Sequence, residues 1–113
     1  MTWLVTGGAG YIGSHVVRAL LDAGQDTVVL DDLSTGREAF VPRAARFVRG
    51  SILDGELVLD ALEEHHVTGV IHVAGFKYAG VSVTRPLHTY EQNVEGTRVL
   101  LGAMHERGVE KIV

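Results

Sequence analysis

The sequence predicts a doubly wound α/β fold, in which helices cover both faces of a sheet of parallel strands. Short apolar runs of strand length alternate along the chain with segments of helical periodicity. A glycine-rich turn, TGGAGYIGSH at 6–15, joins the first apolar run to the first helical segment. Right-handed crossovers then give the strand order 3-2-1-4-5, with a ligand crevice between strands 1 and 4.

The expected strands are short and apolar, because both faces of a parallel sheet are covered. They span residues 2–6, 27–30, 46–49, 68–73 and 111–113. The chain only begins the last of them, so we expect a sheet truncated in its fifth strand. With its length of 113 residues, the chain is then expected to form part of a single domain.

Helices are expected where apolar side chains recur every three or four residues. The expected helices run over 11–23, from the N-cap Asp54 to His65, and from Pro86 to Gly108. The apolar face of the last helix is expected to carry Leu87, Tyr90, Val94, Thr97, Leu101 and Met104. Pro42 limits any helix within 37–46 to a short piece. The stretch 74–85 is expected to be a loop, because it is rich in glycine and small residues.

Composition describes a globular chain with a core, since 46% of residues are hydrophobic and 21% charged. A net charge of −4 argues against a nucleic-acid partner. No apolar run is long enough to span a bilayer and no secretory leader opens the chain, so we expect no membrane partner. The lack of cysteine suits the cytoplasm. The histidines share no metal-ligand spacing with a carboxylate, so we assign no metal.

Two glycine spacings overlap in the turn at 6–15. Gly8, Gly10 and Gly13 give G-x-G-x-x-G, whereas Gly7, Gly10 and Gly13 give G-x-x-G-x-x-G. Such glycines permit a tight turn, close approach of the backbone to a pyrophosphate, and close packing of helix on strand. The first turn of the following helix supplies an anion site. An ordinary tight turn is the alternative interpretation of so short a motif.

Asp31 follows the second expected strand, where a dinucleotide site places a carboxylate for the adenosine ribose hydroxyls. A turn residue at the end of a strand is the alternative interpretation. Asp32 adds a second carboxylate, and the pair would repel a 2′-phosphate. Arg37 is the counter-argument, because an arginine can accommodate that phosphate. We favour NAD over NADP.

Further candidate residues follow the third and fourth expected strands. Ser51 and Ile52 can border the adenine, and the small residues of 73–77 let the backbone pass close to a cofactor. Lys77 could donate to phosphate or ribose oxygens, or could be a solvated loop lysine. Asn93 lies inside the last expected helix and shares a side with Tyr90 and Thr97 that could face the sheet. From spacing alone, a solvent-facing asparagine is the favoured interpretation.

Several separated motifs resemble those of the extended short-chain dehydrogenases/reductases. They are TGGAGYIGSH at 6–15, LDDLS at 30–34, IHVAG at 71–75 and YEQNVEGT at 90–97. Within that superfamily, AGFK at 74–77, GVSV at 80–83 and RPL at 85–87 are similar to the UDP-hexose 4-epimerases. The resemblance extends over essentially the whole chain. It implies that residues 1–113 are the N-terminal part of a single NAD-binding domain and that the substrate-binding domain of the family is absent.

The resemblance implies a Rossmann fold with tightly bound NAD, which takes a hydride from C4 of a UDP-hexose and returns it to the other face. UDP-glucose and UDP-galactose are thereby interconverted, and the full-length protein is implied to be a homodimer. The implied cofactor contacts are Gly7, Gly10, Tyr11, Ile12, Gly13, Asp31, Asp32, Leu33, Ser34, Thr35, Gly36, Ser51, Ile52, Val73, Ala74, Gly75, Phe76, Lys77 and Asn93.

The general base of the family is a tyrosine that a lysine four residues later activates, because a free phenol stays protonated at neutral pH. Four positions after the three tyrosines of this chain, Tyr11, Tyr78 and Tyr90, stand His15, Ser82 and Val94. We therefore expect the pair to lie beyond Val113 and the 113-residue chain alone to be inactive. The alternatives are another extended member, such as a sugar-nucleotide dehydratase or reductase, and a non-catalytic NAD-binding fragment.

Overall fold

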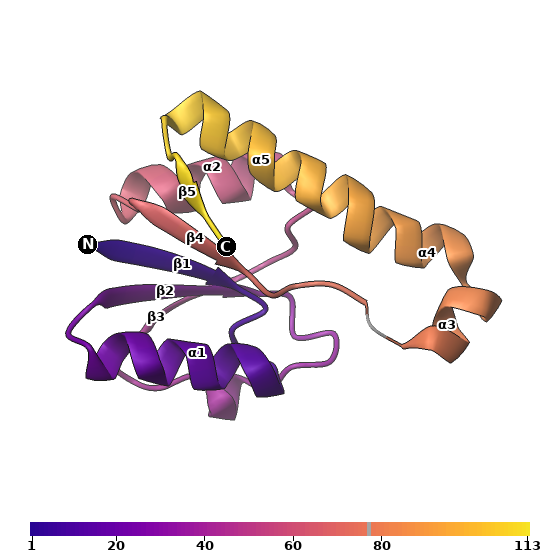
Figure 1. Ribbon diagram of the computed structural model, residues 1–113, viewed down its shortest axis with the longest axis horizontal. Helices are drawn as coiled ribbons and strands as arrows, with labels where there is room; N and C mark the ends of the chain where they lie inside the picture. The colour runs from indigo at the N-terminus through magenta and orange to yellow at the C-terminus, as the bar shows by residue number, and fades with distance from the viewer. Residues whose placement is uncertain (77) are drawn as a thin grey trace.

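The computed structural model describes residues 1–76 and 78–113. Its strands pair in parallel in the order β3-β2-β1-β4-β5 (Figure 1). Their bounds are β1 (Thr2–Thr6), β2 (Asp26–Asp31), β3 (Arg46–Arg49), β4 (Gly69–His72) and β5 (Lys111–Ile112). The predicted doubly wound fold and its strand order are confirmed.

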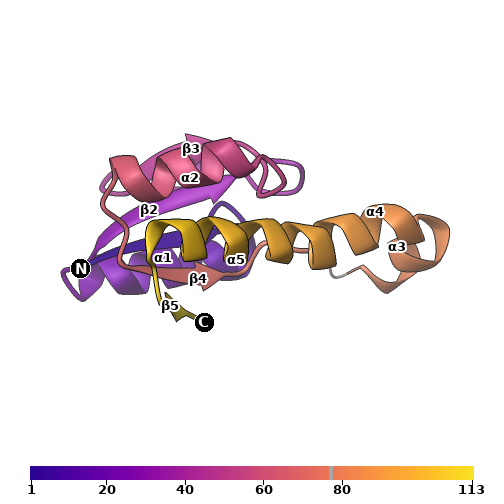
Figure 2. The ribbon, with the colours of Figure 1, turned by 90° about the horizontal axis from the view of Figure 1, so that it is seen from above.

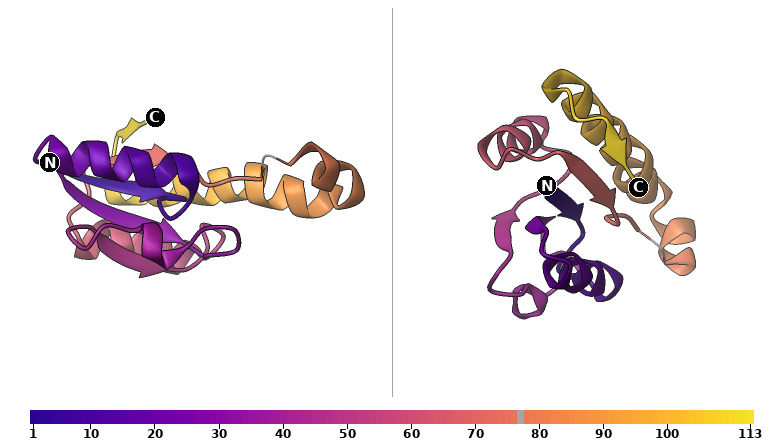
Figure 3. Two further views of the ribbon diagram at one scale, coloured as in Figure 1. Left: turned by 90° about the horizontal axis from the view of Figure 1, so that it is seen from below. Right: turned by 60° about the vertical axis from the view of Figure 1, so that its left-hand side comes forward.

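Helices cover both faces of this sheet. They are α1 (Tyr11–Asp22), the 3₁₀ turn η1 (Glu38–Phe40), α2 (Gly55–Glu64), α3 (Ala79–Thr84), α4 (Pro86–Tyr90), the π-helical turn η2 (Glu91–Glu95) and α5 (Gly96–Arg107). Helix α1 lies on one face, and α2 and α5 lie side by side on the other (Figures 1 and 2). The right-hand view of Figure 3 shows α1 on one side of the sheet and α2 and α5 on the other.

The core has one apolar layer on each face of the sheet. Leu4 belongs to the layer beneath α2 and α5, whereas its neighbour Val5 belongs to the layer beneath α1. Both side chains are fully buried. Alternation of this kind explains why the strands are continuously apolar, since each successive side chain meets a helix on one face or the other.

The helix ends agree with the sequence signals. The carboxylate of Asp54 accepts a hydrogen bond from the Leu57 amide at 3.2 Å, as an N-cap does. Gly108 ends α5 in the left-handed conformation, with φ +70°. One expectation was wrong: the stretch 74–85 is not wholly a loop, because α3 forms within it. Small residues such as Ala79 permit a helix as readily as a loop.

The last helix buries a different face from the one predicted. Of the expected apolar face, Met104 is buried, but Leu87 and Tyr90 are 84% and 61% exposed. Residues that are buried in the helix include Gly96, Leu100, Ala103 and Met104. Two physical reasons account for the difference. The π-helical turn η2 inserts a residue and so rotates the faces on either side of it. The N-terminal half of the helix also runs past the end of the sheet (Figure 1).

Candidate dinucleotide-binding site

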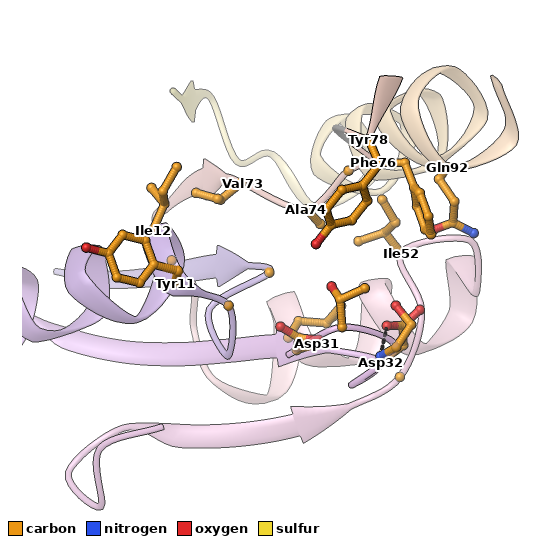
Figure 4. A pocket seen from close by; sticks show the side chains of 18 residues that line it. Tyr11, Ile12, Asp31, Asp32, Ile52, Val73, Ala74, Phe76, Tyr78 and Gln92 are labelled. Carbon is orange, nitrogen blue, oxygen red and sulfur yellow. Dashed lines mark hydrogen bonds between the residues drawn. The ribbon is translucent and has the colours of Figure 1, made fainter. Parts of the chain in front are cut away.

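A cavity of about 290 Å³ lies at the carboxyl ends of β1, β2 and β4 (Figure 4). The strand order reverses between β1 and β4, and ligands of doubly wound sheets bind at such a point. Of the predicted site residues, those that line it are Gly7, Gly10, Tyr11, Ile12, Gly13, Asp31, Asp32, Ser34, Thr35, Ile52, Val73, Ala74, Gly75 and Phe76. The structure thus brings together segments that lie far apart in the sequence.

Four predicted residues, Leu33, Gly36, Ser51 and Asn93, do not line this cavity, and Lys77 lies outside the described residues. The prediction missed four lining residues, Leu30, Gly50, Tyr78 and Gln92. Leu30 lies near the end of β2 and Gly50 directly follows β3. Both lie at the carboxyl edge of the sheet, so the predicted strand ends could have identified them. Tyr78 and Gln92 depend on side-chain directions around α3 and η2, for which the sequence carries no comparable signal.

The structure decides between the two overlapping glycine spacings. Gly7 has φ +71°, and a Cβ atom there would lie 2.8 Å from the Ala74 amide nitrogen. A Cβ atom on Gly13 would collide with the carbonyl oxygen of Gly7. Gly8 is buried against Val29 and does not line the cavity. The spacing that faces the cavity is therefore Gly7, Gly10 and Gly13.

The first turn of α1 gives the cavity its anion-binding character. The helix begins at Tyr11 after Gly10, which has no capping side chain. The backbone amides of Tyr11, Ile12 and Gly13 have no acceptor within the helix, because the carbonyl groups four residues earlier lie before the helix begins. They carry the positive end of the helix dipole, so this wall suits a phosphate group.

Asp31 stabilises the turns around it and also lines the cavity. Its Oδ2 atom accepts a hydrogen bond from the Ala9 amide at 2.9 Å, and its Oδ1 atom accepts one from Leu33 at 2.8 Å. The first bond fixes the glycine turn, and the second holds Leu33 in the left-handed region at φ 62°. The carboxylate also borders the cavity, although the residue is only 8% exposed.

The charges at this end of the cavity are negative. Asp32 lines it beside Asp31, and its Oδ1 atom accepts a hydrogen bond from the Ser34 amide at 2.9 Å (Figure 4). Arg37 does not line the cavity, and its guanidinium lies over the Phe40 ring, 5.8 Å from the centroid. Arg37 therefore does not offset the negative charge that a 2′-phosphate would bring into the cavity. The two carboxylates favour a dinucleotide without this phosphate, such as NAD.

Asn93 shapes the cavity wall from behind. Its Oδ1 atom accepts a hydrogen bond from the Phe76 amide at 2.6 Å, and its Nδ2 atom donates to the Phe76 carbonyl oxygen at 2.9 Å. The side chain is thus engaged with the backbone that follows β4, whereas the residue itself remains exposed, as the solvent-facing interpretation expected. Because Phe76 lines the cavity, Asn93 sets the position of a lining residue.

His72 ends β4 next to the cavity wall. Its ring nitrogens lie 2.6 Å from the Thr6 hydroxyl and 3.1 Å from the Thr97 hydroxyl. Burial lowers the pKa of His72, because the charged ring loses hydration there. The folded chain therefore prefers the neutral imidazole.

The lowered pKa of His72 predicts a loss of stability in acid. The unfolded chain takes up a proton near the ordinary histidine pKa of about 6.5, before the folded chain does. We expect the contribution of His72 to the unfolding free energy to be complete above that pH and to fall as the pH drops below it. Urea unfolding at several pH values, compared with His72→Gln, measures it. Parallel curves for the two chains would contradict the expectation.

No helix in the described ranges is long and apolar enough to cross a membrane. The same residues contain no group of three or more histidine, aspartate or glutamate side chains that could hold a metal ion. The cavity is lined by the backbone of the glycine turn, by two carboxylates, by hydroxyl and amide side chains such as Ser34, Thr35 and Gln92, and by apolar side chains.

A glycine turn against a helix N-terminus, with a carboxylate at the end of β2, defines a dinucleotide-binding domain of the doubly wound α/β class. The chain belongs to the NAD dependent epimerase/dehydratase family, whose model matches residues 3–113.

Relatives of known activity resemble nearly the whole chain. The UDP-glucose 4-epimerase of Azospirillum brasilense is 46% identical over 97% of this chain and 32% of its own length. A solved structure of the Thermus thermophilus UDP-glucose 4-epimerase with NAD is 44% identical, covers 99% of this chain and 36% of its own, and has a TM-score of 0.96. The structure of the Bifidobacterium longum UDP-glucose 4-epimerase, solved with NAD⁺ and UDP, is 34% identical. It covers 99% of this chain and 36% of its own, with a TM-score of 0.95. The chain spans about a third of the length of these relatives.

Proposed function

We propose that residues 1–113 form the N-terminal part of the NAD-binding domain of a UDP-glucose 4-epimerase. The observation that carries this proposal is the cavity between the glycine turn and the end of β4, with Asp31 at its far end. The three relatives above are all UDP-glucose 4-epimerases, and two of their structures contain the cofactor.

The residues present fit the cofactor. The turn around Gly7 and Gly13 leaves no room for a Cβ atom, so its backbone can approach a pyrophosphate, and the amides of the first α1 turn would bind it. Asp31 would accept hydrogen bonds from the adenosine ribose, and Ile52 would border the adenine. Bound NAD supplies a hydride acceptor and donor.

The catalytic base would come from outside residues 1–113. Within this range no tyrosine is followed four residues later by lysine, so the tyrosine–lysine pair of the family is not found there. The UDP-hexose would contact residues on the open side of the cavity, which Tyr11 and Tyr78 border. A cytoplasmic location belongs to the same proposal and rests on the absence of cysteine.

The 113-residue chain is expected to bind NAD without epimerising UDP-galactose. Calorimetric titration measures the binding, and a coupled assay for UDP-glucose measures turnover in protein freed of host enzyme. A relative that contains the missing base, such as the Azospirillum epimerase, is the positive control for both. Turnover by the chain itself, or the absence of any NAD binding, would contradict this assignment.

We also propose that the protein pairs with a second copy through the exposed face of α4 and α5. Leu87, Tyr90, Val94 and Leu101 are 84%, 61%, 49% and 46% exposed. They lie on α4, η2 and α5, which together form a helical segment that projects past the sheet (Figure 2). Exposed apolar side chains gathered on one segment are typical of an interaction surface.

The pairing predicts that Leu101→Glu shifts the chain toward the monomer, because two carboxylates would be buried in the contact. Sedimentation velocity over a range of concentrations measures the shift. Glu106→Gln, an exposed change on the same helix, is the matched control. An unaltered chain that stays monomeric throughout would refute the pairing.

A further inference from the structure

A chain of hydrogen bonds links Thr6, His72 and Thr97 next to the cavity. The donor and acceptor of each bond can be assigned by starting from Thr97. The Thr97 hydroxyl donates to the carbonyl oxygen of Asn93 at 2.7 Å. Its single hydrogen is thereby used, so at 3.1 Å from His72 Nε2 its oxygen acts as the acceptor. The proton of the neutral His72 ring therefore resides on Nε2.

The other ring nitrogen completes the assignment. His72 Nδ1 carries a lone pair and lies 2.6 Å from the Thr6 hydroxyl. The Thr6 hydroxyl oxygen accepts hydrogen bonds from the amides of Val73 at 3.1 Å and Ala74 at 3.2 Å, and the Val73 amide is shared with the Thr6 carbonyl oxygen at 3.1 Å. Both lone pairs of the hydroxyl oxygen are then occupied, so its hydrogen points to Nδ1. Because Nε2 carries the ring proton, Nδ1 is the acceptor for the Thr6 hydroxyl. A second ring proton, on Nδ1, would meet a hydroxyl oxygen that already accepts two amides.

The network joins three segments that surround the cavity. Thr6 is fully buried and precedes Gly7, the first glycine of the turn. Val73 and Ala74 form the opposite wall, and Ala74 lies close enough to Gly7 to exclude a Cβ atom there. Thr97 lies one helical turn after Asn93, which holds the backbone of Phe76.

We propose that His72 is a positioning residue for the dinucleotide site, because its ring fixes the glycine turn and the wall after β4 relative to α5. The inference rests on the proposed function, since the positioned groups are those assigned to NAD. His72 itself does not line the cavity. An apolar side chain would fill the same space, but would leave the Thr6 hydrogen without its acceptor and remove the bond to Thr97.

Two substitutions separate the halves of the network. His72→Asn can keep an acceptor near the position of Nδ1 and loses the donor to Thr97. His72→Gln can keep a donor near the position of Nε2 and loses the acceptor for Thr6. His72→Phe loses both, and Thr97→Val should reproduce His72→Asn. His105→Gln, an exposed change on α5, is the control.

Calorimetric titration of the 113-residue chain with NAD tests the positioning role. We expect the dissociation constant to rise at least about tenfold in His72→Phe and by less in His72→Asn and His72→Gln, whereas the control stays unchanged. Thermal unfolding of each variant identifies the folded ones, and the Asn, Gln and Thr97→Val variants carry the test if His72→Phe does not fold. Folded variants that all bind NAD like the unaltered chain would overturn the role.

A second measurement needs no cofactor. Nitrogen-15 NMR of the imidazole at neutral pH should show a protonated Nε2 and an unprotonated Nδ1 for His72. A proton on Nδ1 would overturn the network as assigned. An unaltered chain with the expected tautomer but no affinity for NAD would instead overturn the proposed function, so the two failures are distinguishable.

Discussion

Replacement of Gly13 by alanine is expected to abolish measurable NAD binding. The new Cβ atom would collide with the carbonyl oxygen of Gly7, which is backbone and cannot turn aside as a side chain can. The turn must open or α1 must move, and overpacking of this kind costs about 1–3 kcal/mol of stability. Because the same backbone carries the amides assigned to the pyrophosphate, we expect the NAD dissociation constant to rise at least about 100-fold.

Gly102→Ala is the matched control for this change. Gly102 lies within α5, and a Cβ atom added there would meet no atom of another element within 4 Å. Helix propensity should then raise the unfolding free energy by about 0.5–1 kcal/mol and leave NAD binding unaltered. Titration calorimetry and urea unfolding of both variants measure the contrast. A Gly13→Ala chain that binds NAD as tightly as Gly102→Ala would refute the tight turn as the phosphate site.

Asp31→Asn is expected to give the second large effect. The carboxylate accepts one backbone hydrogen bond on each oxygen, from Ala9 and from Leu33. Asparagine offers a single oxygen, so its amide group would face one of these N–H donors. The loss of a charged hydrogen bond costs about 1.5–3 kcal/mol, and we expect NAD affinity to fall about 10- to 100-fold.

The same substitution should narrow the preference for NAD over NADP. It removes one of two negative charges at the expected ribose end, whereas Asp32 remains. Competition titrations with both dinucleotides measure the ratio, and Asp60→Asn, an exposed change on α2, is the control. An unchanged ratio of the two affinities in Asp31→Asn would place the ribose elsewhere in the cavity.

The order of the elements could be predicted from the sequence because the signals were local. Continuous apolar runs predicted the strands, and Asp54 and Gly108 predicted helix ends that the structure confirms. The buried face of the last helix could not be predicted. It depends on the π-helical turn η2 and on where the sheet ends beneath the helix, and neither is a local property of Leu87 or Tyr90.

The site could be predicted to the level of the segments that meet, but not of every side chain. The spacing between Gly13 and Asp31 reflects a fixed strand and turn geometry, so it identifies both residues. Asn93 is exposed, as its spacing predicted, but its side chain also binds the Phe76 backbone, which the sequence did not predict. This contact forms only in the folded chain, where η2 lies beside the backbone that follows β4. The roles of the lining residues toward a cofactor stay predictions.

The most direct test of the NAD site is an NMR titration of the 113-residue chain, in which backbone amides are followed as NAD is added. The amides of Gly10, Ile12 and Gly13 should shift most, together with those of Asp32 and Ala74. The amides of His105, Gly108 and Glu110, at the opposite end of α5, should stay in place. The largest shifts at that far end, or none at the glycine turn, would contradict the assignment of this cavity to NAD.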